Sequence, residues 1–355
     1  MKALTYHRYG TPDVLTWSDV ERPVPGPHDV LLRVRAASLN RADLFMLHGS
    51  PRIARLAFGL SRPKATILGR DVAGIVEAVG PQVTCFRPGD EVFGEVEQRG
   101  FAEYVTAPAA DLAPKPAGLS FTDAATLPVA ATTALQALRL AGTGTGTKAG
   151  TQAGTGTGAG TEADSGTSTH AGTGAGTGVG KTVLVNGASG GVGTFVVQLA
   201  RSFGATVTGV CSTRNVDLAR KLGAARVIDY TREDVTATAD RFDAVIDLAG
   251  SHRLTAMRRL LTPRGVYVAS TGTGGPVLGP VPRLLAVAVT ERFVGPLLFT
   301  LVTKRDVDDL ALLAGMVERG EVSPAIERTY PMSEAKAALW HLEREHARGK
   351  VVLSL

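Results

Sequence analysis

The sequence predicts an α/β protein that combines a doubly wound parallel sheet with a smaller, mostly β domain. From residue 181 onwards, apolar strand segments alternate with amphipathic helical segments. Near the start of this alternation, the glycine-rich run NGASGGVG (186–193) follows a strand and opens a helix. Before it, residues 1–120 contain short β segments separated by turn signals. A chain of 355 residues is long enough for two domains.

The predicted β domain covers residues 1–125. The segments VLLRVRAASL, AGIVEAVG and FAEYVTAP are rich in Val and Ala and are bounded by Gly and Pro clusters. A helix is predicted next, over about residues 122–140, with Thr122 or Asp123 as its cap. Its residues after Pro128 are almost all apolar, which indicates a helix buried between two layers.

Residues 142–180 are almost entirely Gly, Thr and Ala. Such a segment cannot bury enough apolar area to offset the entropy lost on ordering. We therefore expect a disordered insertion, which we interpret as a coding-repeat expansion within a short connection and to which we assign no function.

The strand–helix alternation predicts a second domain over residues 126–300, in which this insertion lies. Its strands are apolar throughout, as in parallel sheets covered on both faces. Residues 301–355 then contain two helical segments and a last strand, KVVLSL. We expect this C-terminal part to return to the first domain.

Composition narrows the functional classes. The net charge is +5, but the basic residues are scattered, which argues against a nucleic-acid-binding surface. Two distant cysteines, Cys85 and Cys211, favour a reducing compartment, and no secretory signal is recognisable, so we expect a cytoplasmic protein. Charged residues and a proline interrupt the apolar stretch 284–302, which argues against a membrane span.

The glycine-rich run predicts a dinucleotide site. Backbone N–H groups at a helix N-terminus bind phosphate, and glycines let the pyrophosphate approach closely. Gly190 and Gly193 match the second and third glycines of the dinucleotide fingerprint, and Ala188 stands at the position of the first. The alternative is a purely structural turn. The expected cofactor-binding residues here are Ala188, Ser189, Gly190, Gly191, Val192 and Gly193.

The end of the following strand predicts NADP(H) as the cofactor. An acidic residue there would bind the ribose 2′-OH of NAD, but the strand reads GVCSTRN. Ser212 and Arg214 instead suit a 2′-phosphate, and Tyr230 after the next strand can add a phenolic donor. The alternative for Arg214 is that it only caps a helix.

Several motifs together carry a family resemblance that spans nearly the whole chain outside the insertion. GRDVAGIVEAVG, RPGDEVFG, LPVAATTALQAL, NGASGGVG, CSTRN and HARGKVVL resemble the quinone oxidoreductase branch of the medium-chain dehydrogenase/reductase family. The resemblance implies a GroES-like β domain, a Rossmann domain, a cleft between them and a homodimer.

The chain departs from the zinc-dependent members of that family. Their catalytic zinc needs a cysteine where this chain reads LNRAD, and a histidine where it reads Gly69-Arg70-Asp71. The four-cysteine structural lobe is also absent, since GEVEQRGFAEY runs straight through. We therefore expect no metal site.

What remains is hydride transfer from NADPH to a hydrophobic quinone or α,β-unsaturated carbonyl. Two alternatives stay open: an alcohol or aldehyde oxidoreductase of the same family, and a non-enzymatic NADPH-binding interaction protein.

The resemblance also implies site residues. Asn40 is expected to hydrogen-bond the acceptor oxygen and Asp43 to orient it or relay a proton, although Asp43 is equally suited to capping the helix that follows. Thr133 is expected near the nicotinamide, or else bonded to its own helix. His346 and Arg348 are expected to close over the cofactor, or else to be surface charges. The tyrosine of the family is absent, and His48 is an unassigned candidate.

Overall fold

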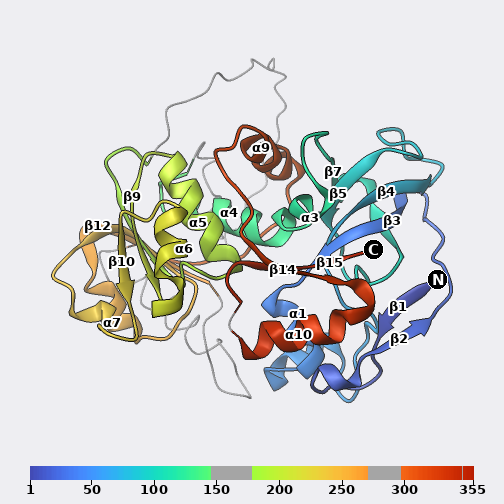
Figure 1. The fold of residues 1–355 in the computed structure, drawn as a ribbon, viewed down its shortest axis with the longest axis horizontal. Coiled ribbons are helices and arrows are strands. Elements are labelled where there is room, and N and C mark those ends of the chain that lie inside the picture. Colours follow the sequence, from blue (N-terminus) through green and yellow to red (C-terminus); the bar gives the residue numbers. More distant parts are fainter. Residues whose placement is uncertain (145–177, 271–296, 346) are drawn as a thin grey trace, which may run out of the picture.

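The computed structural model describes residues 1–144, 178–270, 297–345 and 347–355. A parallel sheet and a largely antiparallel sheet lie side by side, with α4 and α9 near their junction (Figure 1). Most of the predicted insertion, most of the apolar stretch 284–302 and His346 lie outside the described residues. Within the described part of the chain, no helix is long and apolar enough to cross a membrane.

The parallel sheet has the strand order of a dinucleotide-binding fold. Its strands are β8 (Thr182–Asn186), β9 (Thr206–Cys211), β10 (Arg226–Asp229), β11 (Phe242–Asp247), β12 (Leu261–Ala269) and β13 (Leu297–Thr300). The order β10-β9-β8-β11-β12-β13 is the Rossmann order 3-2-1-4-5-6, and all five pairings are parallel. The predicted doubly wound sheet is therefore confirmed. The order reverses between β8 and β11, so a ligand crevice is expected at the carboxyl end of β8.

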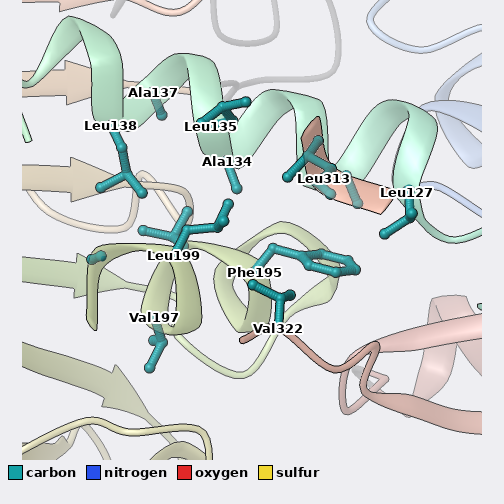
Figure 2. Packing of buried hydrophobic residues seen from close by; sticks show 14 of the residues in the cluster. Leu127, Ala134, Leu135, Ala137, Leu138, Phe195, Val197, Leu199, Leu313 and Val322 are labelled. Atoms are coloured by element: carbon teal, nitrogen blue, oxygen red, sulfur yellow. The ribbon is translucent and has the colours of Figure 1, made fainter. Parts of the chain in front are cut away.

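Helices cover this sheet and bury its core. They are α4 (Thr132–Leu140), α5 (Gly191–Ser202), α6 (Val216–Lys221), α7 (Leu254–Arg258) and α9 (Val307–Glu318). Figure 2 shows Leu135 and Leu138 of α4 facing Phe195 and Leu199 of α5, with Leu313 of α9 beside them. Burial of each such side chain contributes about 1.5–3 kcal/mol. This packing holds α5 against the rest of the molecule. It also holds the glycine-rich loop between β8 and α5, which is called the phosphate loop below.

The helix predicted over residues 122–140 is divided into three pieces. These are α3 (Phe121–Ala124), a π-helical turn η4 (Leu127–Ala131) and α4. The cap of α3 is Ser120, whose Oγ accepts the Asp123 N–H at 3.0 Å, so the predicted cap at Thr122 or Asp123 is wrong. Pro128 has no N–H, and a helix that contains it cannot keep a regular hydrogen-bond ladder.

The second sheet is built from both ends of the chain. Its strands are β3 (Asp29–Ser38), β4 (Asp71–Val79), β5 (Glu91–Glu95), β6 (Tyr104–Pro108), β7 (Leu112–Pro114), β14 (Ile326–Pro331) and β15 (Lys350–Ser354). The same domain contains a separate two-stranded sheet of β1 (Lys2–Thr5) and β2 (Thr16–Asp19). Its helices are α1 (Arg41–His48), α2 (Arg55–Phe58) and α10 (Ala335–Arg344). The last strand pairs with β3, so the two chain ends share one sheet.

The residue before β15 (Lys350–Ser354) also contacts the loop that follows β8. Gly349 forms a parallel bridge with Gly190, and its N–H donates to the Ser189 carbonyl at 2.8 Å. The final strand therefore fixes the carboxyl end of β8 against the second sheet, which is where the candidate site lies.

Deletion of residues 145–176 should leave the fold intact. The described residues on either side already adjoin, since a Cβ on Gly178 would lie 3.2 Å from the Thr143 carbonyl oxygen. Because loop-closure entropy varies only slowly with length, we expect the melting temperature to change by less than about 3 °C. Differential scanning calorimetry on the deletion variant and the full chain tests this expectation, and a fall of ten degrees or so would refute it.

Candidate active site

The loop between β8 and α5 has the geometry of a phosphate cradle. Gly187 has a φ of +94°, and a Cβ on Gly193 would overlap the Gly187 carbonyl oxygen. Gly190 is the N-cap of α5, with no atom closer than 3.5 Å to the place of its Cβ. The positive φ therefore falls on Gly187, and the next residue, Ala188, is buried against Gly209 of β9. The cradle leaves room for a phosphate at the helix N-terminus.

Hydrogen bonds hold this loop from two directions. The Ser189 Oγ accepts from Asn215 Nδ2 at 2.9 Å, and the Ser189 carbonyl accepts from Gly349. Gly191 is half-exposed at the first turn of α5, and Val192 packs partly on the core. The loop is thus preorganised by both sheets before any ligand binds.

A pocket of about 600 Å³ lies at the carboxyl ends of β9 and β10. Its lining includes the three residues predicted to recognise a 2′-phosphate, and it adds Arg344 from the end of α10. The full lining is Ser212, Thr213, Arg214, Tyr230, Thr231, Arg344 and Glu345. Sequence reasoning missed Arg344, because nothing local shows that the end of α10 meets β9.

The pocket offers two guanidinium groups. Arg214 donates to the backbone carbonyl of Glu345, and the Arg344 guanidinium lies 3.7 Å from the centre of the Trp340 ring. Asp229, the acid at the end of β10, already accepts from Thr213 Oγ1 at 2.6 Å and from Thr231. These hydrogen bonds, chiefly that from Thr213, lower the pKa of Asp229. A phosphate would therefore meet arginines and hydroxyls here.

Arg348 lies directly before the Gly349 bridge to the phosphate loop. Its backbone N–H donates to Glu327 Oε2 at 2.8 Å, whereas its Nε is buried and has no hydrogen-bond partner among the described residues. Its role in closing over the cofactor stays a prediction. His346 lies outside the described residues.

Asn40 is held by two side chains that the sequence analysis did not select, Asp71 and Lys350. Its Nδ2 donates to Asp71 Oδ2 at 2.9 Å, and its Oδ1 accepts from Lys350 Nζ at 2.8 Å. Burial raises the pKa of Asp71 to about 6 and lowers that of Lys350, although the two opposite charges partly offset these effects. The sequence could have pointed to both residues. Asp71 and Lys350 are ionisable residues at the start of apolar strand segments, DVAGIV and KVVL.

Asp43 takes the capping role that the sequence left open. It is fully buried, and its Oδ2 accepts the Asn40 backbone N–H at 2.7 Å at the start of α1. This geometry makes Asp43 a positioning residue for Asn40. Burial raises the pKa of Asp43 to about 7, and its Oδ1 has no hydrogen-bond partner among the described residues.

Thr133 and His48 also have polar partners within the protein. The Thr133 hydroxyl donates to the Val129 carbonyl at 2.5 Å and lies 3.2 Å from the Thr303 hydroxyl, which is the helix-bonded alternative. His48 Nε2 lies 3.4 Å from Glu343 Oε1 of α10. The structure therefore brings Asn40 together with Asp71 and Lys350, and uses Thr133 within its own helix.

The Asp43→Asn variant should change how stability depends on pH. The pKa of Asp43 is raised in the folded state, so its contribution to stability is complete below the ordinary value of 3.8 and is lost as pH rises to about 7. The neutral amide keeps a hydrogen-bond acceptor and does not titrate. We expect the melting temperature of the variant, relative to the wild type, to rise between about pH 4 and pH 7 and then level off.

Asp123→Asn is the matched control, because Asp123 occupies the same third position of α3 and solvent reaches it. Thermal melts in a series of buffers measure both variants. A difference for Asp43→Asn that is constant with pH would show that its carboxyl group is not destabilised by burial.

Comparisons with known proteins agree with this architecture. The family model described as "Alcohol dehydrogenase GroES-like domain" matches residues 26–117, and "Zinc-binding dehydrogenase" matches residues 222–353. The chain is 31% identical to the NAD(P)H oxidoreductase RTN4IP1, mitochondrial, of Bos taurus, covering 100% of this chain and 89% of the relative. It is 32% identical to a 2-methylene-furan-3-one reductase of Solanum lycopersicum, covering 99% and 79%.

Among solved structures, the quinone oxidoreductase from Coxiella burnetii superposes with a TM-score of 0.81 at 30% identity. The match covers 100% of this chain and 99% of that one. It confirms the predicted fold class, a Rossmann domain with a GroES-like domain. The chain belongs to the medium-chain dehydrogenase/reductase family, in its quinone oxidoreductase branch.

Proposed function

We propose that the protein is an NADPH-dependent, zinc-independent reductase that transfers hydride to a quinone or an α,β-unsaturated carbonyl. The observation that carries this proposal is the pocket at the end of β9, which Arg214 and Arg344 both line. A 2′-phosphate is the feature that distinguishes NADPH from NADH, and two arginines with neighbouring hydroxyls suit it.

The residues present fit the whole dinucleotide. The backbone N–H groups of Gly190 and Gly191 would donate to the pyrophosphate at the N-terminus of α5. Ser189, Val192 and Gly193 would shape the loop. The 2′-phosphate would lie among Ser212, Arg214, Tyr230 and Arg344. When bound, the reduced nicotinamide supplies the hydride, and the protein contributes orientation and hydrogen-bond donors.

Residue identity supports the proposed zinc independence. Arg70 stands where zinc-dependent relatives need a ligand, and a guanidinium does not coordinate zinc. Cys85 is exposed and Cys211 is buried in β9, so the two thiols cannot serve one centre. Among the described residues, no group of three His, Cys, Asp or Glu side chains could hold a metal ion. Without a Lewis acid, alcohol oxidation is disfavoured relative to reduction of an activated acceptor.

The acceptor class rests on the relatives and on the surroundings of Asn40. The Coxiella burnetii relative is named for a quinone, and the Solanum lycopersicum relative is named for a conjugated methylene ketone. Near Asn40, the segment of α1 and α2 exposes Phe45, Ile53 and Leu56, which suits a hydrophobic acceptor. The Asn40 amide would donate to the oxygen on which negative charge develops.

Assembly and location are part of the proposal. Within the described part of the chain, β13 is an edge of the parallel sheet, and its Leu297 is exposed. An edge strand with an exposed leucine favours pairing with a second copy, so we propose a homodimer formed edge to edge. Two free cysteines favour a cytoplasmic protein.

The first test is NADPH oxidation by protein treated with a chelator, measured against a panel of quinones and enones. We expect turnover with NADPH, much slower turnover with NADH and no loss after removal of metal. An aldehyde serves as the control acceptor. Activity that requires added zinc, or that is confined to aldehydes, would overturn the proposal.

The second test concerns the 2′-phosphate. Arg214→Ala and Arg344→Ala should each raise the KM for NADPH roughly 10- to 100-fold and leave that for NADH nearly unchanged, since a charged hydrogen bond contributes about 1.5–3 kcal/mol. Arg328→Ala is the matched control, because Arg328 is exposed and stacks on Tyr330 outside the pocket. An equal rise in KM for NADPH and NADH would show that the 2′-phosphate binds elsewhere.

A further inference from the structure

Lys350 is a buried lysine with every donor engaged. It is the first residue of β15, and its side chain is 2% exposed. Its ammonium group has three acceptors: the Leu39 carbonyl at 3.1 Å, Asn40 Oδ1 at 2.8 Å and Asp71 Oδ2 at 3.5 Å. Three N–H donors thus meet three acceptors, two of them on the segment that leads into α1. A charge this well satisfied is rigidly placed.

Lys350 and Asp71 together determine which way the Asn40 carboxamide points. Lys350 is only a donor and the ionised Asp71 is only an acceptor, so they select opposite ends of the amide. A flipped amide would set two donors against Lys350 and an oxygen against Asp71. Only the orientation with Oδ1 towards Lys350 satisfies both.

In this orientation, one of the two N–H donors of Asn40 Nδ2 is not used by Asp71. Asn40 Nδ2 carries two hydrogens, and its one hydrogen bond among the described residues goes to Asp71. Asn40 is half-buried, so its side chain is not sealed from a ligand. The amide therefore offers an N–H, and not a carbonyl, to an acceptor oxygen. Lys350, bonded to the other end of the same amide, polarises that N–H.

Asp71 is itself fixed. Its Oδ1 accepts the Val129 N–H of the π-helical turn at 3.0 Å, and the residue is fully buried. In a medium of low dielectric constant, an ion pair between Lys350 and Asp71 resists exchange with water. Removal of one partner alone leaves an uncompensated buried charge.

The stem of Lys350 lies against the phosphate loop. A Cβ on Gly191 would lie 3.1 Å from Lys350 Cδ, and the preceding residue bridges to Gly190. The same side chain thus contacts the loop proposed to hold the cofactor and the amide proposed to meet the acceptor.

From these contacts we infer that Lys350 is a positioning residue, which sets the Asn40 carboxamide with an N–H donor towards the acceptor oxygen. The catalytic consequence depends on the proposed reductase function, whereas the orientation of the amide does not. The two can therefore fail separately.

Three variants test this inference. Lys350→Met removes the charge at similar length, and Lys350→Met with Asp71→Asn also removes the uncompensated carboxylate. Lys115→Met is the matched control, because Lys115 is equally buried and donates to the Pro116 and Leu119 carbonyls, remote from the phosphate loop. Each is measured for kcat, for the dissociation constant of NADPH and for melting temperature.

We expect Lys350→Met to lower kcat roughly 10- to 100-fold, with NADPH affinity within about threefold of the wild type. The double variant should regain melting temperature without regaining kcat, and Lys115→Met should keep its kcat. Recovery of kcat along with stability would show a merely structural role. A loss of NADPH affinity equal to the loss of kcat would assign Lys350 to the cofactor loop instead.

The amide orientation has a readout of its own. In protein labelled with ¹⁵N-asparagine, the two Asn40 side-chain amide protons should differ widely in chemical shift. Only one of them is hydrogen-bonded to the Asp71 carboxylate. Lys350→Met should shift both signals, because the Asn40 oxygen loses its charged donor while Asp71 still accepts from Nδ2, and Lys115→Met should leave both in place. An unchanged pair of signals in Lys350→Met would overturn the inference. If the wild type reduces no quinone or enone, the proposed function fails, and these signals still decide the role of Lys350.

Discussion

The buried contact between Lys350 and Asp71 joins parts of the chain that are remote in sequence. Lys350 begins the last strand, Asp71 begins β4, and Asn40 lies between them. Beside this cluster, Gly349 bonds to Ser189, so the last strand also fixes the phosphate loop. The cofactor cradle and the polar centre are therefore positioned by the same few residues, and a shift in one would move the other.

The proposed chemistry requires no metal. A reductase acting on a conjugated acceptor needs an oriented hydride donor and a donor for the developing oxyanion. The pocket with Arg214 and Arg344 would orient the donor by its 2′-phosphate, and the Asn40 amide would meet the oxyanion. In the proposed mechanism, electrostatic preorganisation through Lys350 and Asp71 would take the place of the Lewis acid of zinc-dependent relatives.

Much of the fold could be predicted from sequence because its signals are local. Strand and helix periodicity and the order of segments were enough to predict the parallel sheet, which the strand order confirms. The phosphate loop was predictable because glycine is required where φ is positive or where a Cβ would overlap backbone. The structure adds that the positive φ falls on Gly187, the residue before Ala188, which the fingerprint spacing does not reveal.

By itself, then, the sequence determined the fold class and the residues at the carboxyl ends of β8, β9 and β10, because these follow from short-range pattern and covalent geometry. Only the tertiary structure decided the partners of those residues. Asp43 caps α1, Thr133 bonds to its own helix, and Arg344 completes a pocket that begins at Ser212. Lys350 meets Asn40 from the far end of the chain. Such contacts depend on how two sheets pack, and no local pattern encodes which distant polar group will satisfy a buried charge.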